Sequence, residues 1–156
     1  MSPTNGDKVP DIALTTTGEK RLKLSDFHGA NLVLFFYPKA STPGCTTEGQ
    51  DFRDAADAFA ATSTKILGAS RDGLKAQESF KARHAFPFEL VSDPDEALCK
   101  LFDVIKPKKM FGKEYSGIER STFLIDKAGV LRRQWRKVKV KGHVNEVLAA
   151  AEALDS

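Results

Sequence analysis

The sequence contains little cysteine, and its two cysteines, Cys45 and Cys99, are far apart in the chain. They form no Cys-x-x-Cys pair, which disfavours an ordinary dithiol oxidoreductase, and they are too few for the disulfide framework of a small secreted protein. The three histidines, His28, His84 and His143, show no metal-ligand spacing with either cysteine, so we expect no zinc site. We therefore expect reduced thiols and a cytoplasmic protein.

Long hydrophobic runs are also missing. No apolar stretch approaches the ~20 residues that a membrane-spanning helix needs. The first residues, MSPTNGD, have neither the basic nor the apolar region of a secretory signal, so we expect no such signal and no membrane association. No internal repeat, glycine-rich phosphate-binding pattern or long linker divides the 156 residues. We predict a single domain over residues 1–156, which is long enough to bury one core.

Acidic residues are scarce in one part of the chain. Residues 103–142 hold twelve Lys and Arg against four acids, a net charge of +8, whereas residues 1–102 hold twelve against fourteen, a net of −2. Such a basic segment can attract nucleic acid or an acidic partner. Some of its basic residues alternate with Leu131, Trp135 and Val138, a pattern typical of a solvated edge strand and loop. We favour the edge strand over nucleic-acid binding.

The chain does have a regular alternation of short apolar runs and helical patterns. Strands are expected at 12–14 and 22–24 (a hairpin), 32–37, 65–70, 88–91, 121–126 and 130–135. Helices are expected over 47–61, over 73–84, after Asp93-Pro94 and over 143–154. The alternation predicts a layered α/β domain, with helices on both faces of a sheet. Because the last two strands are joined by a tight turn, we expect a mixed sheet.

The most informative segment leads to Cys45. The apolar strand at 32–37 is followed by Pro38 and a polar turn, and Thr42 then fits the N-cap of a helix whose first residue is Pro43. Cys45 falls in the first turn of that helix. Unpaired amides there carry partial positive charge, which favours the nucleophilic thiolate over the thiol. A buried, inert cysteine is the alternative, but the polar turn after a strand end favours a functional one.

Glu48 adds a requirement to this site. A carboxylate three residues after Cys45 works against the thiolate unless a positive charge offsets it. Two arginines are candidates for that charge: Arg53, on the same helix, and Arg120, at the beginning of a late strand. We expect one or both of them close to the sulfur.

Several segments resemble one known family. Residues 36–48, FYPKASTPGCTTE, resemble the peroxidatic-cysteine motif of peroxiredoxins, and the form TPGCT resembles the bacterioferritin comigratory protein (peroxiredoxin Q) subfamily. Residues 109–113, 120–126 and 137–143 resemble the same subfamily in the expected order. The resemblance covers nearly the whole chain, from residue 6 to residue 154.

This resemblance implies a thioredoxin-like fold and a thiol-dependent peroxidase. Such an enzyme would reduce hydrogen peroxide and organic hydroperoxides in antioxidant defence, without a metal, flavin or haem cofactor. By resemblance, Cys45 would be the peroxidatic nucleophile and would become a sulfenic acid. Thr42 would hydrogen-bond the thiolate and the peroxide, Arg120 would stabilise the thiolate and the developing charge, and Pro38 would shield the site from water.

The chain departs from the subfamily at the resolving cysteine. Many members carry it five residues after the first cysteine, where this chain has Gln50, and others carry it on the following helix, but 73–84 has none. Cys99 lies in a helix whose apolar face must be buried, where a thiol is usually inert. We therefore expect a monomeric one-cysteine enzyme, regenerated by thioredoxin or by glutathione with glutaredoxin. Two alternatives stay open: Cys99 as the resolving thiol, and a redox-regulated binding protein that uses 103–142.

Overall fold

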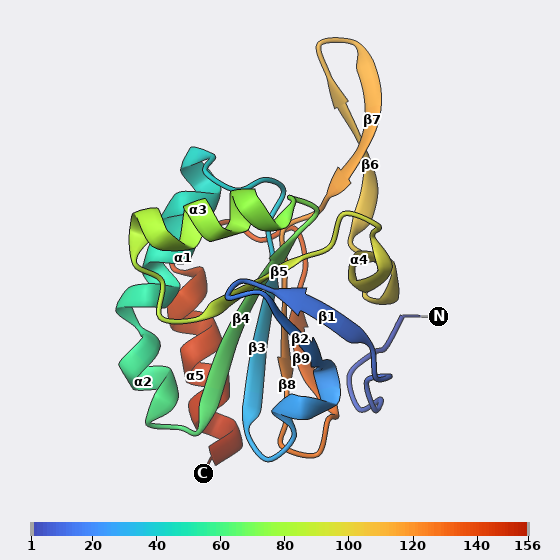
Figure 1. Cartoon of the computed structure of the whole chain (residues 1–156). Helices are drawn as coiled ribbons and strands as arrows, with labels where there is room; N and C mark the ends of the chain where they lie inside the picture. Colours follow the sequence, from blue (N-terminus) through green and yellow to red (C-terminus); the bar gives the residue numbers. More distant parts are fainter. Residues whose placement is uncertain (1, 156) are drawn as a thin grey trace.

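A mixed seven-stranded sheet forms the centre of the computed structural model, which describes residues 2–155 (Figure 1). Its strands run in the order β2-β1-β5-β4-β3-β8-β9. β3 is parallel to β4, and β4 to β5, while the remaining neighbours are antiparallel. The mixed sheet predicted from the sequence is confirmed. The strands are β1 (Ala13–Thr16), β2 (Lys20–Lys23), β3 (Asn31–Phe36), β4 (Thr64–Ser70), β5 (Glu89–Ser92), β8 (Ser121–Ile125) and β9 (Leu131–Trp135).

Helices cover both faces of this sheet, as predicted, but unequally. Side chains from α1, α2, α3 and α5 pack into the core on one face, and those from η1 and α4 pack into the core on the other. Within residues 2–155, no helix is long and apolar enough to cross a membrane. The helices are η1 (Leu24–Phe27), α1 (Pro43–Asp54), α2 (Ala56–Ala60), α3 (Leu74–His84), α4 (Ala97–Leu101) and α5 (His143–Asp155).

The central strand β3 explains why there are two cores. All six of its residues are buried, because it lies between β4 and β8 and both of its faces are covered. Successive side chains of a strand point to opposite faces. Leu32, Leu34 and Phe36 therefore enter the core beneath α4, and Val33 and Phe35 enter the core beneath α1 and α5.

A two-stranded ribbon is the main feature that the sequence pattern did not reveal. β6 (Ile105–Met110) and β7 (Lys113–Ile118) pair only with each other and project from one end of the molecule (Figure 1). They fall in the segment that was predicted as an edge strand and loop. No strand was predicted at residues 105–118, because a ribbon that projects from the core buries little apolar surface and so leaves no apolar alternation in the sequence. The edge-strand prediction, which rested on residues 131–141, is confirmed for β9 at the edge of the main sheet.

Two helix boundaries also differ from the expected ones. The first helix begins at Pro43, as the predicted N-cap at Thr42 requires, but the helical pattern expected to run to residue 61 is interrupted at Ala55 and forms α1 and α2. The helix expected directly after Asp93-Pro94 begins only at Ala97. The Asp93 side chain still caps it, since its carboxylate accepts hydrogen bonds from the amides of Leu98 and Cys99 at 3.0 and 2.8 Å.

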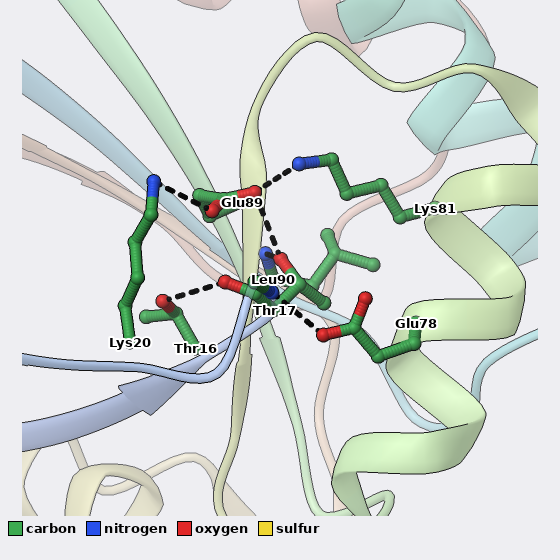
Figure 2. A network of polar contacts seen from close by, with 8 residues as sticks. Thr16, Thr17, Lys20, Glu78, Lys81, Glu89 and Leu90 are labelled. Atoms are coloured by element: carbon green, nitrogen blue, oxygen red, sulfur yellow. Dashed lines mark hydrogen bonds and ion pairs between the residues drawn. The ribbon is translucent and has the colours of Figure 1, made fainter.

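Glu89 joins the N-terminal hairpin to the body of the molecule (Figure 2). From β5, its carboxylate accepts a hydrogen bond from the Thr17 hydroxyl at 3.1 Å and pairs with Lys20 at 3.1 Å and with Lys81 of α3. Burial raises the pKa of Glu89, but the hydrogen bonds from Lys81, Lys20 and Thr17 outweigh burial and leave this pKa below its ordinary value. The hairpin, β5 and α3 are thus held at one carboxylate.

We expect Glu89→Gln to lower the free energy of unfolding by about 1–2 kcal/mol, because the amide keeps an acceptor but loses the charge that faces two lysines. Since the folded state lowers the pKa of Glu89, this contribution exists above the pKa of an unfolded glutamate. This contribution is lost as the pH falls, so the difference in the free energy of unfolding between Glu89→Gln and wild type should narrow below about pH 4.

Urea unfolding at several pH values measures the free energy of unfolding of wild type and Glu89→Gln, with the exposed Glu152→Gln as the matched control. Equal effects of the two substitutions would contradict the assigned role of Glu89.

Candidate active site

Cys45 occupies the position that the sequence predicted, in the first turn of α1. Thr42 is the N-cap and Pro43 the first helical residue. The first backbone hydrogen bond of the helix is donated by the Thr46 amide to the Thr42 carbonyl, at 2.8 Å. The amide of Cys45 precedes that bond, so it has no acceptor within the helix and adds positive potential near the sulfur. The Cys45 side chain is buried, with 1% of the residue exposed.

Arg120 is the cation that the site requires. Its Nη2 lies 3.4 Å from Cys45 Sγ, and its Nη1 donates a hydrogen bond of 2.7 Å to Glu48 Oε1. A Cβ at Gly44 would stand 3.2 Å from Nη2, so the glycine leaves room for the guanidinium beside the helix. One side chain therefore places positive charge against the sulfur and neutralises the neighbouring carboxylate.

Sheet register explains why Arg120 reaches the sulfur from so far along the sequence. β8 is antiparallel to β3, with Ser121 opposite Phe36. The residue before β8 therefore lies where β3 ends and the chain turns toward α1. Two backbone hydrogen bonds hold the chain in place at Arg120. The Glu119 amide donates to the Val104 carbonyl at 2.7 Å, and the Val138 amide donates to the Arg120 carbonyl at 3.0 Å.

Glu48 is a buried carboxylate with one unusual feature. Its residue is 0% exposed, and no described residue donates a hydrogen bond to its second oxygen, Oε2. Burial raises the pKa of Glu48 to about 7, against the opposing charge of Arg120. Arg120 responds in the complementary direction: burial lowers its pKa, but Glu48 and Cys45 outweigh burial and raise it. Glu48 therefore holds Arg120 in place at a cost in solvation.

Thr42 and Pro38 lie on the turn that joins β3 to α1, just before Cys45. Pro38 directly follows the buried Tyr37, and both Pro38 and Thr42 are partly exposed. The Thr42 hydroxyl donates a hydrogen bond of 2.8 Å to the Lys39 carbonyl. Since its proton is used in this way, the hydroxyl oxygen presents its lone pairs as acceptors.

Sequence reasoning missed the side chain that holds this turn. Asp72, just after β4, accepts a hydrogen bond from the Ala40 amide at 2.7 Å and another from the Ser70 hydroxyl at 2.6 Å. Gln77 of α3 donates to the same Ser70 hydroxyl at 3.0 Å and accepts from the Tyr37 hydroxyl at 2.6 Å. The parallel pairing of β3 and β4 brings these polar groups to one edge of the sheet, a contact that no local motif signals.

Two residues that were considered for the site lie elsewhere. Arg53 donates a 3.0 Å hydrogen bond to the His84 carbonyl and pairs with Asp54, so of the two candidate arginines it is Arg120 that contacts Glu48 and the sulfur. Cys99 is buried in the core on the opposite face of the sheet from Cys45. Burial and the neighbouring Asp93 raise the pKa of Cys99 well above its ordinary value.

His143, at the beginning of α5, is also near the site. Its Nε2 lies 2.8 Å from the Thr122 hydroxyl, and burial together with the positive charge of Arg120 lowers the pKa of His143 to about 4. The imidazole is therefore neutral near pH 7 and adds no charge beside the guanidinium. Its position in the chain, far from any cysteine, gave no signal of this proximity.

Comparison with known proteins gives one family. Residues 5–134 match the AhpC/TSA family. Peroxiredoxin Bcp of Bacillus subtilis is 53% identical over 143 residues, which cover 92% of this chain and 91% of that protein. Peroxiredoxin Bcp of Xanthomonas campestris is 52% identical over 143 residues, which cover 92% of this chain and 89% of that protein.

Solved structures agree with these relatives. A mutant of PrxQ from Xylella fastidiosa superposes with a TM-score of 0.94 at 42% identity, over 100% of this chain and 99% of that one. Peroxiredoxin Q of Xanthomonas campestris superposes with a TM-score of 0.89 at 51% identity, over 93% and 92%. The thioredoxin-like fold and the predicted family are confirmed.

The raised pKa of Glu48 predicts a pH dependence of stability. A carboxyl whose pKa is higher in the folded state than in the unfolded state, near 4.5, favours folding most below the unfolded value and loses that effect as the pH rises through about 7. Between about pH 5 and pH 8 we expect the free energy of unfolding of wild type to fall, relative to Glu48→Gln, by up to about 3 kcal/mol.

Urea titrations at several pH values test this prediction, with Glu152→Gln as the exposed control. If the free energy of unfolding of wild type and of Glu48→Gln varied with pH in parallel, the pKa of Glu48 would not be raised by burial.

Proposed function

The chain belongs to the AhpC/TSA family, and on this premise we propose that it is a peroxidase in which Cys45 reduces hydroperoxides to water or alcohols. Its peroxiredoxin relatives support thiol-dependent peroxidase activity in general. The observation that carries the proposal for these residues is the contact of 3.4 Å between Arg120 Nη2 and Cys45 Sγ. It places a fixed cation at a thiol that lies in the first turn of a helix.

The first half of the reaction oxidises Cys45. The thiolate attacks the nearer peroxide oxygen, an S–O bond forms and the O–O bond breaks, leaving a sulfenic acid and an alkoxide or hydroxide. The sulfur loses two electrons to the peroxide, and the leaving oxygen takes up a proton to become an alcohol or water. Arg120 stabilises the negative charge as it moves from sulfur to oxygen.

Thr42 and Pro38 position the substrate in this scheme. The Thr42 hydroxyl, which already donates its proton to the Lys39 carbonyl, can accept the hydrogen of the peroxide HO group and orient the O–O bond over the sulfur. Pro38, partly exposed in the same turn, is proposed to limit the access of water to the sulfur. Both hydrogen peroxide and organic hydroperoxides fit this chemistry, and the Xanthomonas campestris relative is described as reducing alkyl peroxides.

The second half of the reaction uses an outside thiol. Cys45 and Cys99 are both free thiols, and they lie in cores on opposite faces of the sheet. A disulfide requires Cα atoms within ~7 Å, so Cys99 could resolve Cys45 only after a rearrangement, such as local unfolding of α1, that brings the two residues together. We propose a monomeric, cytoplasmic one-cysteine enzyme. A thiol of thioredoxin, or of glutathione acting with glutaredoxin, attacks the sulfenic sulfur and forms a mixed disulfide with release of water. A second thiol then attacks the sulfur of the reductant in that mixed disulfide and releases Cys45 as a thiolate.

Substitution of the cysteines separates the mechanisms. After one equivalent of hydroperoxide, without added thiol, we expect wild type and Cys99→Ser to carry a dimedone-reactive sulfenic acid on Cys45, whereas Cys45→Ser carries none and has no peroxidase turnover. Intact mass and peptide mapping measure this. A peptide pair that joins Cys45 to Cys99 would make Cys99 the resolving thiol. An unmodified Cys45 would refute the peroxidase and favour the binding protein that uses residues 103–142.

Arg120→Met should lower kcat/KM for the hydroperoxide by about 10²–10³-fold, because the transition state loses one fixed charge at the reacting sulfur. Arg53→Met is the matched control: the same charge is removed from a side chain that contacts the His84 carbonyl, and we expect less than a ~3-fold change. Stopped-flow oxidation of Cys45 provides both rates. Similar losses in the two variants would mean that Arg120 acts only through general electrostatics or folding.

A further inference from the structure

The β6–β7 ribbon carries the two large hydrophobic side chains that are most exposed in the described chain. Phe111, at the turn, is 97% exposed, and Tyr115 on β7 is 44% exposed. Phe111 also has a positive φ of 54°, a backbone conformation that costs a bulky residue roughly 1–2 kcal/mol. A ring that is this exposed adds little to the stability of the chain and is free to contact another molecule.

The charge of the ribbon is almost entirely of one sign. Between residues 105 and 118 there are four lysines, Lys106, Lys108, Lys109 and Lys113, against a single acid, Glu114. Glu114 pairs with Lys109 at 3.5 Å, at the exposed end. A surface that combines positive charge with an apolar tip fits a protein whose own surface surrounds an apolar depression with carboxylates.

The base of the ribbon lies at the active site. β7 ends at Ile118, and Arg120 follows two residues later, so the ribbon rises from the end of the sheet where β3 leads to Cys45 (Figure 1). Burial lowers the pKa of Lys108 on β6, and the charges of both Arg120 and Cys45 act on it. A partner bound along the ribbon would therefore have part of its surface beside the candidate active site.

Arg71 holds the ribbon in this place. Its Nη2 donates a hydrogen bond of 3.1 Å to the Ser116 carbonyl of β7, and its Nη1 pairs with Glu96, before α4, at 2.9 Å. An isolated two-stranded hairpin is only marginally stable in water, so this fastening gives the ribbon a defined direction. A partner thus meets a preformed surface.

We propose that the β6–β7 ribbon is the docking arm for the acidic dithiol protein that reduces oxidised Cys45, with Phe111 as the apolar anchor. The proposal rests on the peroxidase function above. In the docked complex, the first thiol of the partner attacks the sulfenic sulfur and forms a mixed disulfide with release of water. The second thiol of the partner then displaces Cys45 as a thiolate and closes a disulfide within the partner.

The test compares three full-length variants in peroxide turnover. Phe111→Ser removes the anchor, Lys113→Glu reverses one charge at the tip, and Lys127→Glu makes the same reversal in the exposed turn between β8 and β9, at the other end of the sheet. Turnover is driven either by a thioredoxin of net negative charge with its NADPH-dependent reductase or by dithiothreitol. Stopped-flow oxidation of Cys45 by peroxide is measured separately.

We expect kcat/KM for thioredoxin to fall about tenfold in Phe111→Ser and in Lys113→Glu, and to stay within about twofold in Lys127→Glu. Added salt should slow wild type more than Lys113→Glu, because screening acts on the charge that the variant has lost. Oxidation of Cys45 and turnover with dithiothreitol should be unchanged in all three variants, which also shows that they are folded.

Several outcomes would overturn the docking arm and leave the peroxidase intact. One is an equal thioredoxin rate in all variants. Another is reduction of wild type by dithiothreitol but by neither thioredoxin nor glutaredoxin with glutathione. A third is a change in sedimentation or in binding to DNA or anionic vesicles with an unchanged thioredoxin rate, which would assign the ribbon to a second copy, a nucleic acid or a membrane. Failure of Cys45 to react with peroxide would instead refute the peroxidase.

Discussion

The contact of Arg120 with both Cys45 and Glu48 is the constraint on which the site depends. Negative charges on Cys45 and Glu48, one helical turn apart, would repel each other, and a single guanidinium lies within hydrogen-bonding distance of both side chains and offsets both charges. For this to work, the arginine must arrive from the side of the helix and stay there. The antiparallel register of β8 on β3 brings Arg120 to that place, and two backbone hydrogen bonds, at Glu119 and at Arg120 itself, keep it there. The buried carboxylate then fixes the orientation of the guanidinium.

The part of this arrangement that the sequence predicts is the part encoded within a few residues. An apolar strand, a proline and a Thr-Pro-Gly-Cys sequence suffice to place Cys45 in the first turn of a helix, and the negative charge of Glu48 suffices to require a cation. The identity of that cation is not local information. Arg53 and Arg120 have the same chemistry, and only sheet register distinguishes them. The support of the turn by Asp72 depends on register in the same way.

The ribbon and the separation of the two cysteines also depend on contacts between segments that are far apart in the sequence. Residues 105–118 bury little apolar surface, so their pairing leaves no hydrophobic period in the sequence, and their strands become evident only in three dimensions. Cys99 was expected to be buried from the apolar pattern of its helix, and it is. That it lies behind the sheet from Cys45 follows from the alternation of β3 side chains into two cores, a property of the whole sheet.

The burial of Cys45 has a kinetic consequence. A peroxide is small enough to reach a sulfur on a residue that is only 1% exposed, but a thiol carried by a protein is not. In the proposed reaction, the first turn of α1 would have to loosen and expose the oxidised sulfur before a protein thiol could form a bond to it. Oxidation and regeneration would then need two conformations of the same helix, and the hydrogen bonds that favour the closed conformation would delay its opening. The stability of one helical turn would set the interval between the two steps, during which a sulfenic acid is open to further oxidation.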